Sequence, residues 1–285
     1  MDKSASLPEH VQAVIRDKGT ERPHTGEYND YSDNGTYICR QCGLALFRAK
    51  HKFHSGCGWP SFDNEIEGTV KRLQDSDGER IEILCSRCDA HLGHVFEGEG
   101  FTEANTRHCV NSTSLEFVPD LEVRDTEEAI FAAGCFWGVE YFFQKLKGVL
   151  KTQVGYTGGS KDNPTYDDVC RGDTGHYEAI RVIYNPEVIS YEDIVKYFFE
   201  IHNFSQDNGQ GPDIGHQYLS AIFVYDEKQR EIAEALISRL QQMDYGVSTS
   251  ILPVNVFWPA EVDHQKFYEK KGSEPYCHTY TKIFK

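Results

Sequence analysis

Cysteines are the residues with which this 285-residue chain can do the most chemistry, and it has nine of them. Four form two pairs, Cys39 with Cys42 and Cys85 with Cys88, and two residues separate the thiols of each pair. Two such turns can present four thiolates to one tetrahedral ion, and a closed site of this kind is typical of structural zinc. Four unrelated buried or redox-active thiols are the alternative interpretation. We expect one structural Zn²⁺ per chain, bound by the four paired cysteines.

A further cysteine, Cys109, follows Arg107 and lies downstream of two histidines, His91 and His94. A guanidinium or an imidazole beside a thiol favours the thiolate, which is the nucleophilic form of cysteine. The histidines could instead be metal ligands or ordinary structural residues, but the four paired cysteines already complete a ligand set. This cluster predicts a nucleophilic cysteine in the first half of the chain.

Cys135 lies between a segment that reads as a buried strand, residues 129–133, and an amphipathic helix at 137–146. The free N–H groups and the positive end of the helix dipole favour a thiolate at such a position. The glycines on either side allow a tight turn and close approach of a substrate. A small apolar residue at a strand-to-helix turn is the alternative. The position predicts a second nucleophile.

Two different patterns of secondary structure position these cysteines. The first half reads as short β segments separated by turns, at residues 36–39, 81–85 and 112–118. The second half alternates further strands, at 177–184 and 219–225, with helices that begin after Ser190 and after Asp226.

The composition changes at a charged segment, residues 119–128, which marks a boundary. We expect one domain at 1–118, a linker at 119–128 and a second domain at 129–285. A chain of this length can give each domain a core of its own.

The net charge of the chain, −16, and its patterning bear on its partners and compartment. Neither half has a basic face that would neutralise phosphates, so we expect neither nucleic acid nor an anionic membrane as a partner. No apolar stretch is long enough to span a bilayer, and the first residues do not read as a secretory signal. An odd number of cysteines argues against a secreted disulfide scaffold. We therefore expect a cytoplasmic protein.

The surroundings of Cys109 resemble methionine sulfoxide reductase B from about residue 7 to residue 118. Besides the paired cysteines, the resemblance rests on three motifs: Gly56-Cys57-Gly58-Trp59-Pro60-Ser61-Phe62, His91-x-x-His94-Val-Phe96 and Arg107-His108-Cys109-x-Asn111-Ser112. It implies that Cys109 is the nucleophile and Cys57 the resolving thiol. It also implies a substrate pocket with Trp59 and Phe96, proton-handling roles for His91 and His94, and control of the thiolate and the oxygen site by Arg107 and Asn111.

The surroundings of Cys135 resemble methionine sulfoxide reductase A from roughly 128 to 277. The motifs are Gly134-Cys135-Phe136-Trp137, Asn163-Pro164-Thr165-Tyr166, Gly175-His176-Tyr177-Glu178-Ala179 and Asp213-Ile214-Gly215-His216-Gln217-Tyr218. The resemblance implies attack by Cys135 and a methyl pocket of Phe136 and Trp137. It implies an oxygen site of Tyr166, Glu178 and Tyr218, supported by Asp213, and a resolving role for Cys277. Tyr177 stands where the family commonly has a small residue, and the tail lacks the usual Gly before Tyr276-Cys277.

Together the two resemblances imply an α+β protein of two domains. The first would be a mainly-β, zinc-bearing domain like methionine sulfoxide reductase B, and the second an α/β ferredoxin-like sandwich like methionine sulfoxide reductase A. The implied function is repair of oxidised methionine, of the R epimer by the first domain and the S epimer by the second. Sulfenic acid and disulfide intermediates would be reduced by a thioredoxin-like partner. The alternative is a zinc-bearing thiol redox sensor without repair activity.

Overall fold

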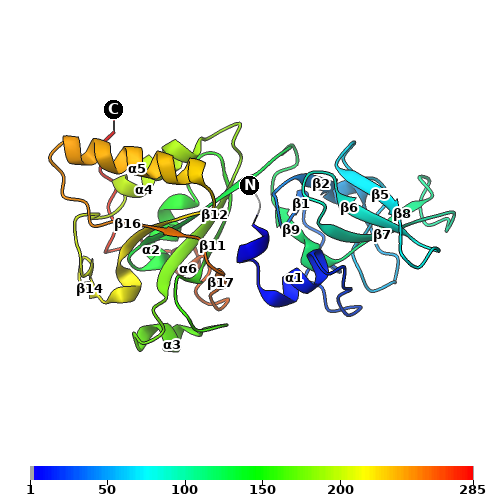
Figure 1. The fold of residues 1–285 in the computed structure, drawn as a ribbon, viewed down its shortest axis with the longest axis horizontal. Coiled ribbons are helices and arrows are strands. Elements are labelled where there is room, and N and C mark those ends of the chain that lie inside the picture. The colour runs from blue at the N-terminus through cyan, green and yellow to red at the C-terminus, as the bar shows by residue number, and fades with distance from the viewer. Residues whose placement is uncertain (1–2, 285) are drawn as a thin grey trace. The chain divides into compact units, whose positions relative to one another are not determined.

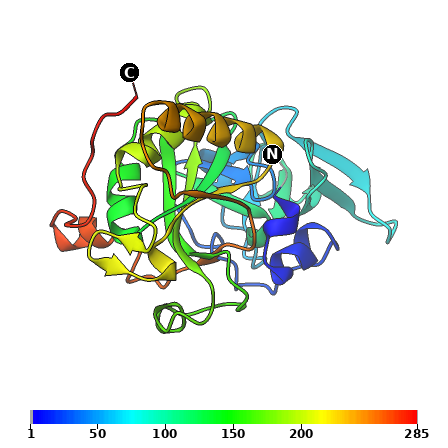
Figure 2. The ribbon, with the colours of Figure 1, turned by 60° about the vertical axis from the view of Figure 1, so that its left-hand side comes forward.

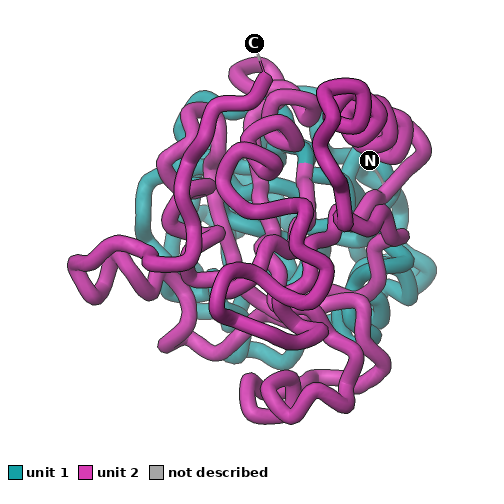
Figure 3. The backbone as a smooth tube through the Cα atoms, turned by 90° about the vertical axis from the view of Figure 1, so that its left-hand side faces the viewer, with its two compact units in different colours: residues 1–127 teal, residues 128–285 magenta. Residues whose placement is uncertain are grey.

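The computed structural model describes residues 3–284, and the chain divides into two compact units, residues 1–127 and 128–285 (Figures 1 and 3). Unit 1 is mainly β, and unit 2 has a mixed sheet covered by helices. This confirms the two-domain α+β class. None of the helices among residues 3–284 is long and apolar enough to span a membrane.

Unit 1 begins with a short helix, α1 (Glu9–Ile15), and contains two antiparallel sheets. The smaller has the order β2 (Ala45–Arg48), β1 (Thr36–Cys39) and β9 (Leu115–Val118). The larger has the order β3 (Lys52–Phe53), β4 (Ser61–Phe62), β8 (Thr106–Val110), β7 (His91–Glu97), β6 (Ile81–Cys85) and β5 (Val70–Gln74). Tyr37, Phe47 and Phe62 are fully buried in the core that the sheets share.

The strand that the sequence predicts at 112–118 is shorter in the structure. Only Leu115–Val118 pairs as a strand, and Ser112–Ser114 forms a 3₁₀ turn. The carboxylate of Glu21 accepts the backbone N–H groups of Ser112 and Thr113 at 2.5 and 2.9 Å. These donors are therefore used by a side chain and are not available to a sheet.

Unit 2 is built on a six-stranded sheet with the order β16 (Ser250–Pro253), β15 (Ser220–Val224), β10 (Glu127–Ala133), β12 (Tyr177–Tyr184), β11 (Val149–Thr157) and β17 (Trp258–Pro259). Helices α2 (Phe136–Phe143) and α4 (Tyr191–Glu200) connect the middle strands in the sequence β10-α2-β11-β12-α4-β15. This sequence of elements, together with the strand order β15-β10-β12-β11, defines the ferredoxin-like sandwich.

The long helix α5 (Glu227–Gln242) packs beside α4 over one face of this sheet (Figure 2). Phe131, Phe143 and Phe198 lie in the core between the helices and the sheet. The starts of α4 and α5 follow from side-chain caps: Ser190 accepts the N–H of Asp193, and Asp226 accepts that of Gln229.

Helix α2 ends earlier than the sequence predicts. The N–H groups of Lys145 and Leu146 bond to the carbonyls of Phe142 and Phe143, three residues back, so the last turn is tighter than an α-helix. Gly148 then takes a positive φ of 96°, which only a glycine adopts easily. The remaining elements of the unit are short: α3 (Tyr166–Cys170), β13 (Gly209–Gln210), β14 (Asp213–Ile214) and α6 (Phe267–Lys271).

Candidate active sites and a metal site

The four paired cysteines of unit 1 converge, with their Sγ atoms all within 4.8 Å of one another. Sγ of Cys39 lies 3.6 Å from that of Cys88, and Sγ of Cys42 lies 3.6 Å from that of Cys85. Four sulfurs at roughly 2.3 Å from a tetrahedral zinc would lie about 3.8 Å apart, so the set fits this ion. All four side chains are buried or half-buried, as a closed structural site requires.

The two turns that carry these cysteines have the same backbone design. In one, the N–H of Gly43 donates to the carbonyl of Cys39 at 2.8 Å, and in the other the N–H of Asp89 donates to that of Cys85 at 3.0 Å. Gly43 and Asp89 both take a positive φ, 80° and 58°. Glycine and Asp are among the residues that tolerate this left-handed conformation, which turns the second cysteine back toward the first.

Strand register places the nucleophile of unit 1 against a histidine. On the larger sheet, Cys109 of β8 is the direct partner of His94 on β7 and of Ser61 on β4. Side chains of directly paired residues share one face of a sheet. The register therefore brings together residues that the sequence only predicts to be near each other.

A cavity of about 110 Å³ opens at Cys109. Trp59, His94, Phe96 and Asn111 line it, as the resemblance implies, and so does Arg80, which it does not include. The indole N–H of Trp59 donates to the carbonyl of Glu21 at 3.1 Å and thereby fixes the ring.

The amide of Asn111 is occupied by the backbone. Its Nδ2 donates to the carbonyl of Leu92 at 3.2 Å, and its Oδ1 accepts the N–H of Glu21 at 3.1 Å. The side chain of Asn111 thus shapes the wall of the cavity by joining two backbone segments.

The thiols of Cys57 and Cys109 lie within hydrogen-bonding distance of each other. Their Sγ atoms are 3.8 Å apart. The hydrogen bond with Cys109 lowers the pKa of Cys57 to about 4, and the same hydrogen bond, followed by burial, raises that of Cys109. Arg107 acts in the opposite direction and lowers the pKa of Cys109. A proton can move between two sulfurs at this distance, so the pKa values alone do not identify the nucleophile. Cys109 lines the cavity and Cys57 does not, which indicates that Cys109 attacks a substrate.

The guanidinium that faces Cys109 is itself held in place. Arg107 donates from Nε and Nη2 to the two carboxylate oxygens of Glu99 at 2.7 and 2.9 Å. Its guanidinium carbon also lies 4.4 Å from the centroid of Phe96, a cation–π contact. Glu99 raises the pKa of Arg107 and keeps the guanidinium charged.

The two motif histidines of unit 1, His91 and His94, are each oriented by a carboxylate that the motifs do not include. Nε2 of His94 lies 2.6 Å from Oδ2 of Asp75, and Nδ1 of His91 lies 2.7 Å from Oε1 of Glu82. Burial lowers the pKa of His91, which is 2% exposed. His91 is not among the residues that line the cavity, and its ring centroid is 5.7 Å from that of His94.

In unit 2, Cys135 is the N-cap of α2, directly after β10. Gly134 before it takes a φ of +91°, and a Cβ there would lie 2.4 Å from the side chain of Gln210. The hydrogen bond with Cys277, and then burial, raises the pKa of Cys135, and the N–H groups of Trp137 and Gly138 act against this rise. The start of the helix therefore supplies donors for a thiolate, as the sequence predicts.

Glu178 is 1% exposed on β12 beside Cys135. Its Oε2 accepts the N–H of Phe136 at 3.1 Å, and its Oε1 has no hydrogen-bond partner among the described residues. Burial, and then the charge of Cys135, raises the pKa of Glu178 well above its usual value. The raised pKa favours the protonated acid form of Glu178, in which Oε1 would be available to donate.

An aromatic cluster surrounds this acid. Phe136, Trp137 and Tyr166 pack with ring centroids 6.4 to 6.5 Å apart. Phe267 of α6 stacks on Trp137 at 3.9 Å and 7°, and Nδ1 of His264 accepts the indole N–H of Trp137 at 3.1 Å.

Tyr166 is held by a residue that the motifs do not include. The carboxylate of Glu261 accepts the backbone N–H of Tyr166 and the hydroxyl of Tyr156, each at 2.9 Å. Glu261 therefore joins the backbone of Tyr166 to Tyr156, a residue of strand β11. No local sequence signal connects these residues, which lie far apart along the chain.

The other predicted members of the oxygen site surround Glu178. The charge of Glu178 raises the pKa of Tyr166 and of Tyr218, in both cases after burial. Oδ2 of Asp213 is buried and, like Oε1 of Glu178, has no hydrogen-bond partner among residues 3–284. Tyr177, the departure from the family pattern, is 8% exposed and packs against His216, with ring centroids 4.6 Å apart.

Of the two remaining thiols of unit 2, Cys277 is hydrogen-bonded with Cys135. The predicted second thiol is therefore already beside the nucleophile. Cys170 is exposed and hydrogen-bonded with the hydroxyl of Tyr166, so it lies at the edge of the aromatic cluster.

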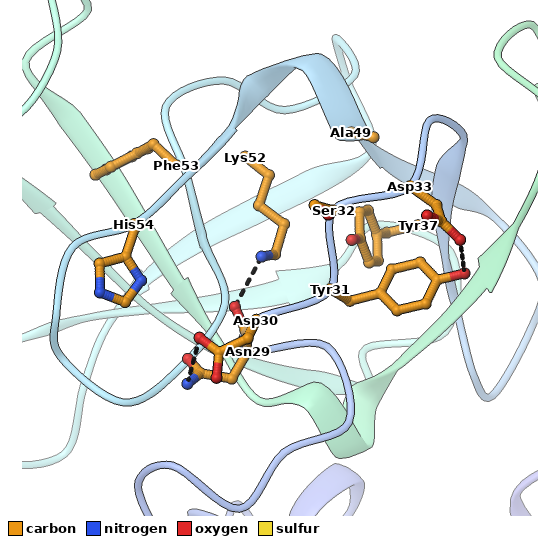
Figure 4. A pocket seen from close by; sticks show the side chains of 10 residues that line it. All are labelled: Asn29, Asp30, Tyr31, Ser32, Asp33, Tyr37, Ala49, Lys52, Phe53 and His54. Carbon is orange, nitrogen blue, oxygen red and sulfur yellow. Dashed lines mark hydrogen bonds between the residues drawn. The ribbon is translucent and has the colours of Figure 1, made fainter.

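Unit 1 has another cavity, of about 280 Å³, under the segment that leads to Cys57 (Figure 4). Lys52 donates to the carbonyl of Asn29 at 2.8 Å across it, and the hydroxyl of Tyr31 donates to Asp33 at 2.8 Å. No cysteine lines this cavity, so it offers no nucleophile for a sulfoxide.

Comparison with known proteins finds a matching family model for each unit. A family model for peptide methionine sulfoxide reductase matches residues 127–285, and a model for the SelR domain matches residues 7–119. Peptide methionine sulfoxide reductase MsrA of Methanosarcina acetivorans is 49% identical over 179 residues, which are 61% of this chain and 94% of that protein. MsrA of Escherichia coli is 46% identical over 178 residues, 60% of this chain and 82% of that protein.

Among solved structures, reduced Mxr1 from Saccharomyces cerevisiae is similar with a TM-score of 0.51 and 33% sequence identity. The match covers 54% of this chain and 92% of that one. The chain therefore belongs to the peptide methionine sulfoxide reductase family, as an enzyme in which a SelR (methionine sulfoxide reductase B) domain precedes a methionine sulfoxide reductase A domain.

Proposed function

We propose that this enzyme repairs both epimers of methionine sulfoxide, the R epimer in unit 1 and the S epimer in unit 2. The sulfoxide sulfur is a stereocentre, and one enzyme type reduces each epimer. Each unit has its own nucleophilic thiol, aromatic wall and proton donor, which supports two independent sites.

In unit 2, the thiolate of Cys135 attacks the sulfoxide sulfur while Glu178 donates a proton to the departing oxygen. The observation that carries this assignment is the buried Oε1 of Glu178, which lies next to Cys135 and has no hydrogen-bond partner within residues 3–284. Phe136 and Trp137 would contact the methyl group, and Tyr166, Tyr218 and Asp213 would complete the oxygen site. The oxygen passes to sulfur, so methionine leaves and Cys135 becomes a sulfenic acid.

In unit 1, Cys109 is the nucleophile and His94 the proton donor, since both line the same cavity and face each other in the sheet. Trp59 and Phe96 would hold the methyl group of the substrate. Arg107 would favour the thiolate, Asn111 would shape the oxygen site, and His91 would support His94.

Each sulfenic acid would condense with a nearby thiol to a disulfide, Cys57 with Cys109 and Cys277 with Cys135. A thioredoxin-like protein would then reduce the disulfide by thiol–disulfide exchange. The short distance between Cys57 and Cys109 and the hydrogen bond between Cys277 and Cys135 support these pairs.

The Cys₄ cluster would hold one structural zinc ion, which would link the two cysteine turns and stabilise unit 1. The number of thiols in the chain supports a reducing location such as the cytoplasm.

The alternative function, a zinc-bearing redox sensor, leaves part of unit 2 without a purpose. A sensor needs a reactive thiol but has no use for a buried acid near a cluster of aromatic rings. The structure's acid–thiol arrangement at Glu178 and Cys135 therefore favours the reductase.

The test is turnover of resolved R and S sulfoxides by the full-length protein. Cys109→Ser should abolish reduction of the R epimer and spare that of the S epimer, and Cys135→Ser should do the reverse. Each variant keeps one working site, which serves as its internal control for folding. Loss of both activities in one folded variant would contradict two independent sites.

A further inference from the structure

His278, the residue after Cys277, joins that thiol to the sheet. Its Nε2 lies 2.7 Å from the carbonyl oxygen of Ala133, and its Nδ1 lies 3.0 Å from Sγ of Cys277. A carbonyl oxygen can only accept a hydrogen bond, so Nε2 carries the ring proton. In the neutral ring, Nδ1 then has a free lone pair, directed at the Cys277 thiol.

The site is shaped to hold this ring. His278 is 4% exposed, and a Cβ at Gly138 would lie 2.2 Å from its Nδ1, so α2 has space for the imidazole only because residue 138 is glycine. Burial lowers the pKa of His278 and keeps the ring neutral. The titratable groups that act on it are Cys277 on the tail, Asp213 on β14 and His202 after α4.

Residues 281–284, beyond His278, are held to Glu200 by hydrogen bonds. This attachment helps to keep His278 against Cys277. The backbone carbonyl of Glu200 accepts the N–H of Thr281 at 2.7 Å. The side-chain Oε1 of Glu200 accepts the N–H groups of Ile283 and Phe284, each at 2.9 Å. Phe284 is buried in the core of unit 2.

Oxidation of Cys135 removes the interaction that lowers the pKa of Cys277. The hydrogen bond with the Cys135 sulfur is the main reason why the pKa of Cys277 is lowered. Once Cys135 is a sulfenic acid, that thiol–thiol pair no longer exists. Burial and the charges of Asp213 and Glu178 remain, and all three raise the pKa of Cys277. These raising effects act against a single backbone hydrogen bond and favour the protonated thiol of Cys277, which is a poor nucleophile.

We propose that His278 is the general base of the recycling step, which removes the proton from Cys277 as it attacks the sulfenic acid of Cys135. This inference rests on the proposed resolving role of Cys277. The Cys277 S–H bond and the S–O bond of Cys135 break, and an S–S bond forms. The Cys277 sulfur is oxidised and the Cys135 sulfur reduced, and the departing hydroxide takes up the proton from Nδ1 as water.

The test measures disulfide formation in the full-length protein with one equivalent of the S sulfoxide of N-acetylmethionine and no reductant. Samples quenched with a thiol-alkylating reagent at successive times and digested give the rate of Cys135–Cys277 disulfide formation, and released methionine gives the first step. The variant is His278→Gln, whose amide can still donate to Ala133 but has no basic nitrogen. The matched control is His202→Gln, because the His202 ring is buried but bonds to Phe198 and Ser220 and not to a thiol.

We expect the native rate of disulfide formation to be flat from pH 8 down to the titration of His278. In His278→Gln it should fall about tenfold per pH unit below the pKa of the Cys277 thiol and be about 100-fold slower than the native rate at pH 7. The His202 variant should keep the native rate from pH 7 to 8, where the His202 ring is neutral because burial lowers its pKa to about 3.

Three results would overturn the proposal. One is a native rate of disulfide formation in folded His278→Gln, and another is a rate in the native protein that already falls tenfold per pH unit below pH 8. The second result needs no variant, so it decides the matter even if His278→Gln does not fold. The third is release of methionine without any Cys135–Cys277 disulfide, which would remove the resolving role of Cys277 itself. Absence of methionine release from the native protein would instead refute the proposed function.

Discussion

Sγ of Cys57 lies 3.8 Å from Sγ of Cys109, with the serine hydroxyls of Ser55 and Ser61 beside it at 3.0 and 3.6 Å. A disulfide requires a sulfur separation of about 2.05 Å, so the two sulfurs need to approach by less than 2 Å. The geometry suits condensation of a sulfenic acid on Cys109 without a large rearrangement.

Replacing Cys57 by Ser should therefore separate the first turnover from the following ones. The R sulfoxide should still yield about one methionine per chain, because Cys109 and its cavity are retained. Turnover driven by thioredoxin should fall at least tenfold, and dithiothreitol should restore it in part because a small thiol can reach the sulfenic acid directly. Cys170→Ser, the matched control, should leave R-epimer turnover as it is. Full thioredoxin-driven turnover in Cys57→Ser would mean that another thiol resolves the intermediate.

The pH dependence of unit 2 should follow Glu178. Its raised pKa means that the acid form is complete below that pKa and is lost as the pH rises through it. The chemical step on the S epimer should therefore slow toward alkaline pH, while the thiolate of Cys135 is favoured. Single-turnover methionine release against pH measures this limb. The amide of Glu178→Gln cannot act as an acid, so methionine release should be slower by about 100-fold or more and should no longer fall toward alkaline pH. A variant that keeps the native rate and the native fall at alkaline pH would exclude Glu178 as the acid.

Asp75 should matter for the R epimer alone. Its hydrogen bond with His94 lowers the pKa of Asp75, so the carboxylate stays ionised throughout the range of an activity assay. Asp75→Asn removes the charge that orients the imidazole and should slow R-epimer reduction about tenfold. The S-epimer rate of the same sample reports the amount of intact unit 2, and a melting curve reports whether unit 1 is folded. An unchanged R-epimer rate would show that His94 does not depend on this partner.

The purified chain should contain one zinc ion per molecule, measured by elemental analysis. Cys85→Ser should lose the ion, because Sγ of Cys85 is fully buried among the other three sulfurs. Unit 1 should then melt at a lower temperature, since binding of a structural zinc ion and folding are coupled. Cys170→Ser, an exposed cysteine of unit 2, is the matched control. Unchanged metal content and melting in Cys85→Ser would exclude a structural Cys₄ site.

The order of strands and helices follows from the sequence because its signals are local, whereas the fold class rests on the two family resemblances. The two C-x₂-C turns, the strand at 177–184 and the side-chain caps at Ser190 and Asp226 each depend on a few neighbouring residues. The early end of α2 and the 3₁₀ turn at 112–114 were missed, since both depend on hydrogen bonds whose partners the sequence pattern does not show.

The partners of the predicted site residues were missed for a similar reason. Asp75 reaches His94, and Glu261 reaches Tyr166, only through the register of strands and the path of loops. A carboxylate on a hairpin or a loop looks like an ordinary solvated charge in the sequence. The motifs thus identify groups that would react, while the residues that orient them require the structure.

The attachment of the C-terminal segment to Glu200 has a consequence for the entropy of recycling. Cys277 belongs to a loop held at both ends, by α6 before it and by residues 281–284 after it. A thiol presented in this way meets Cys135 at a high effective concentration, which dilution of the protein does not change. Most of the entropic cost of closing this loop is therefore met when unit 2 folds, before any disulfide forms.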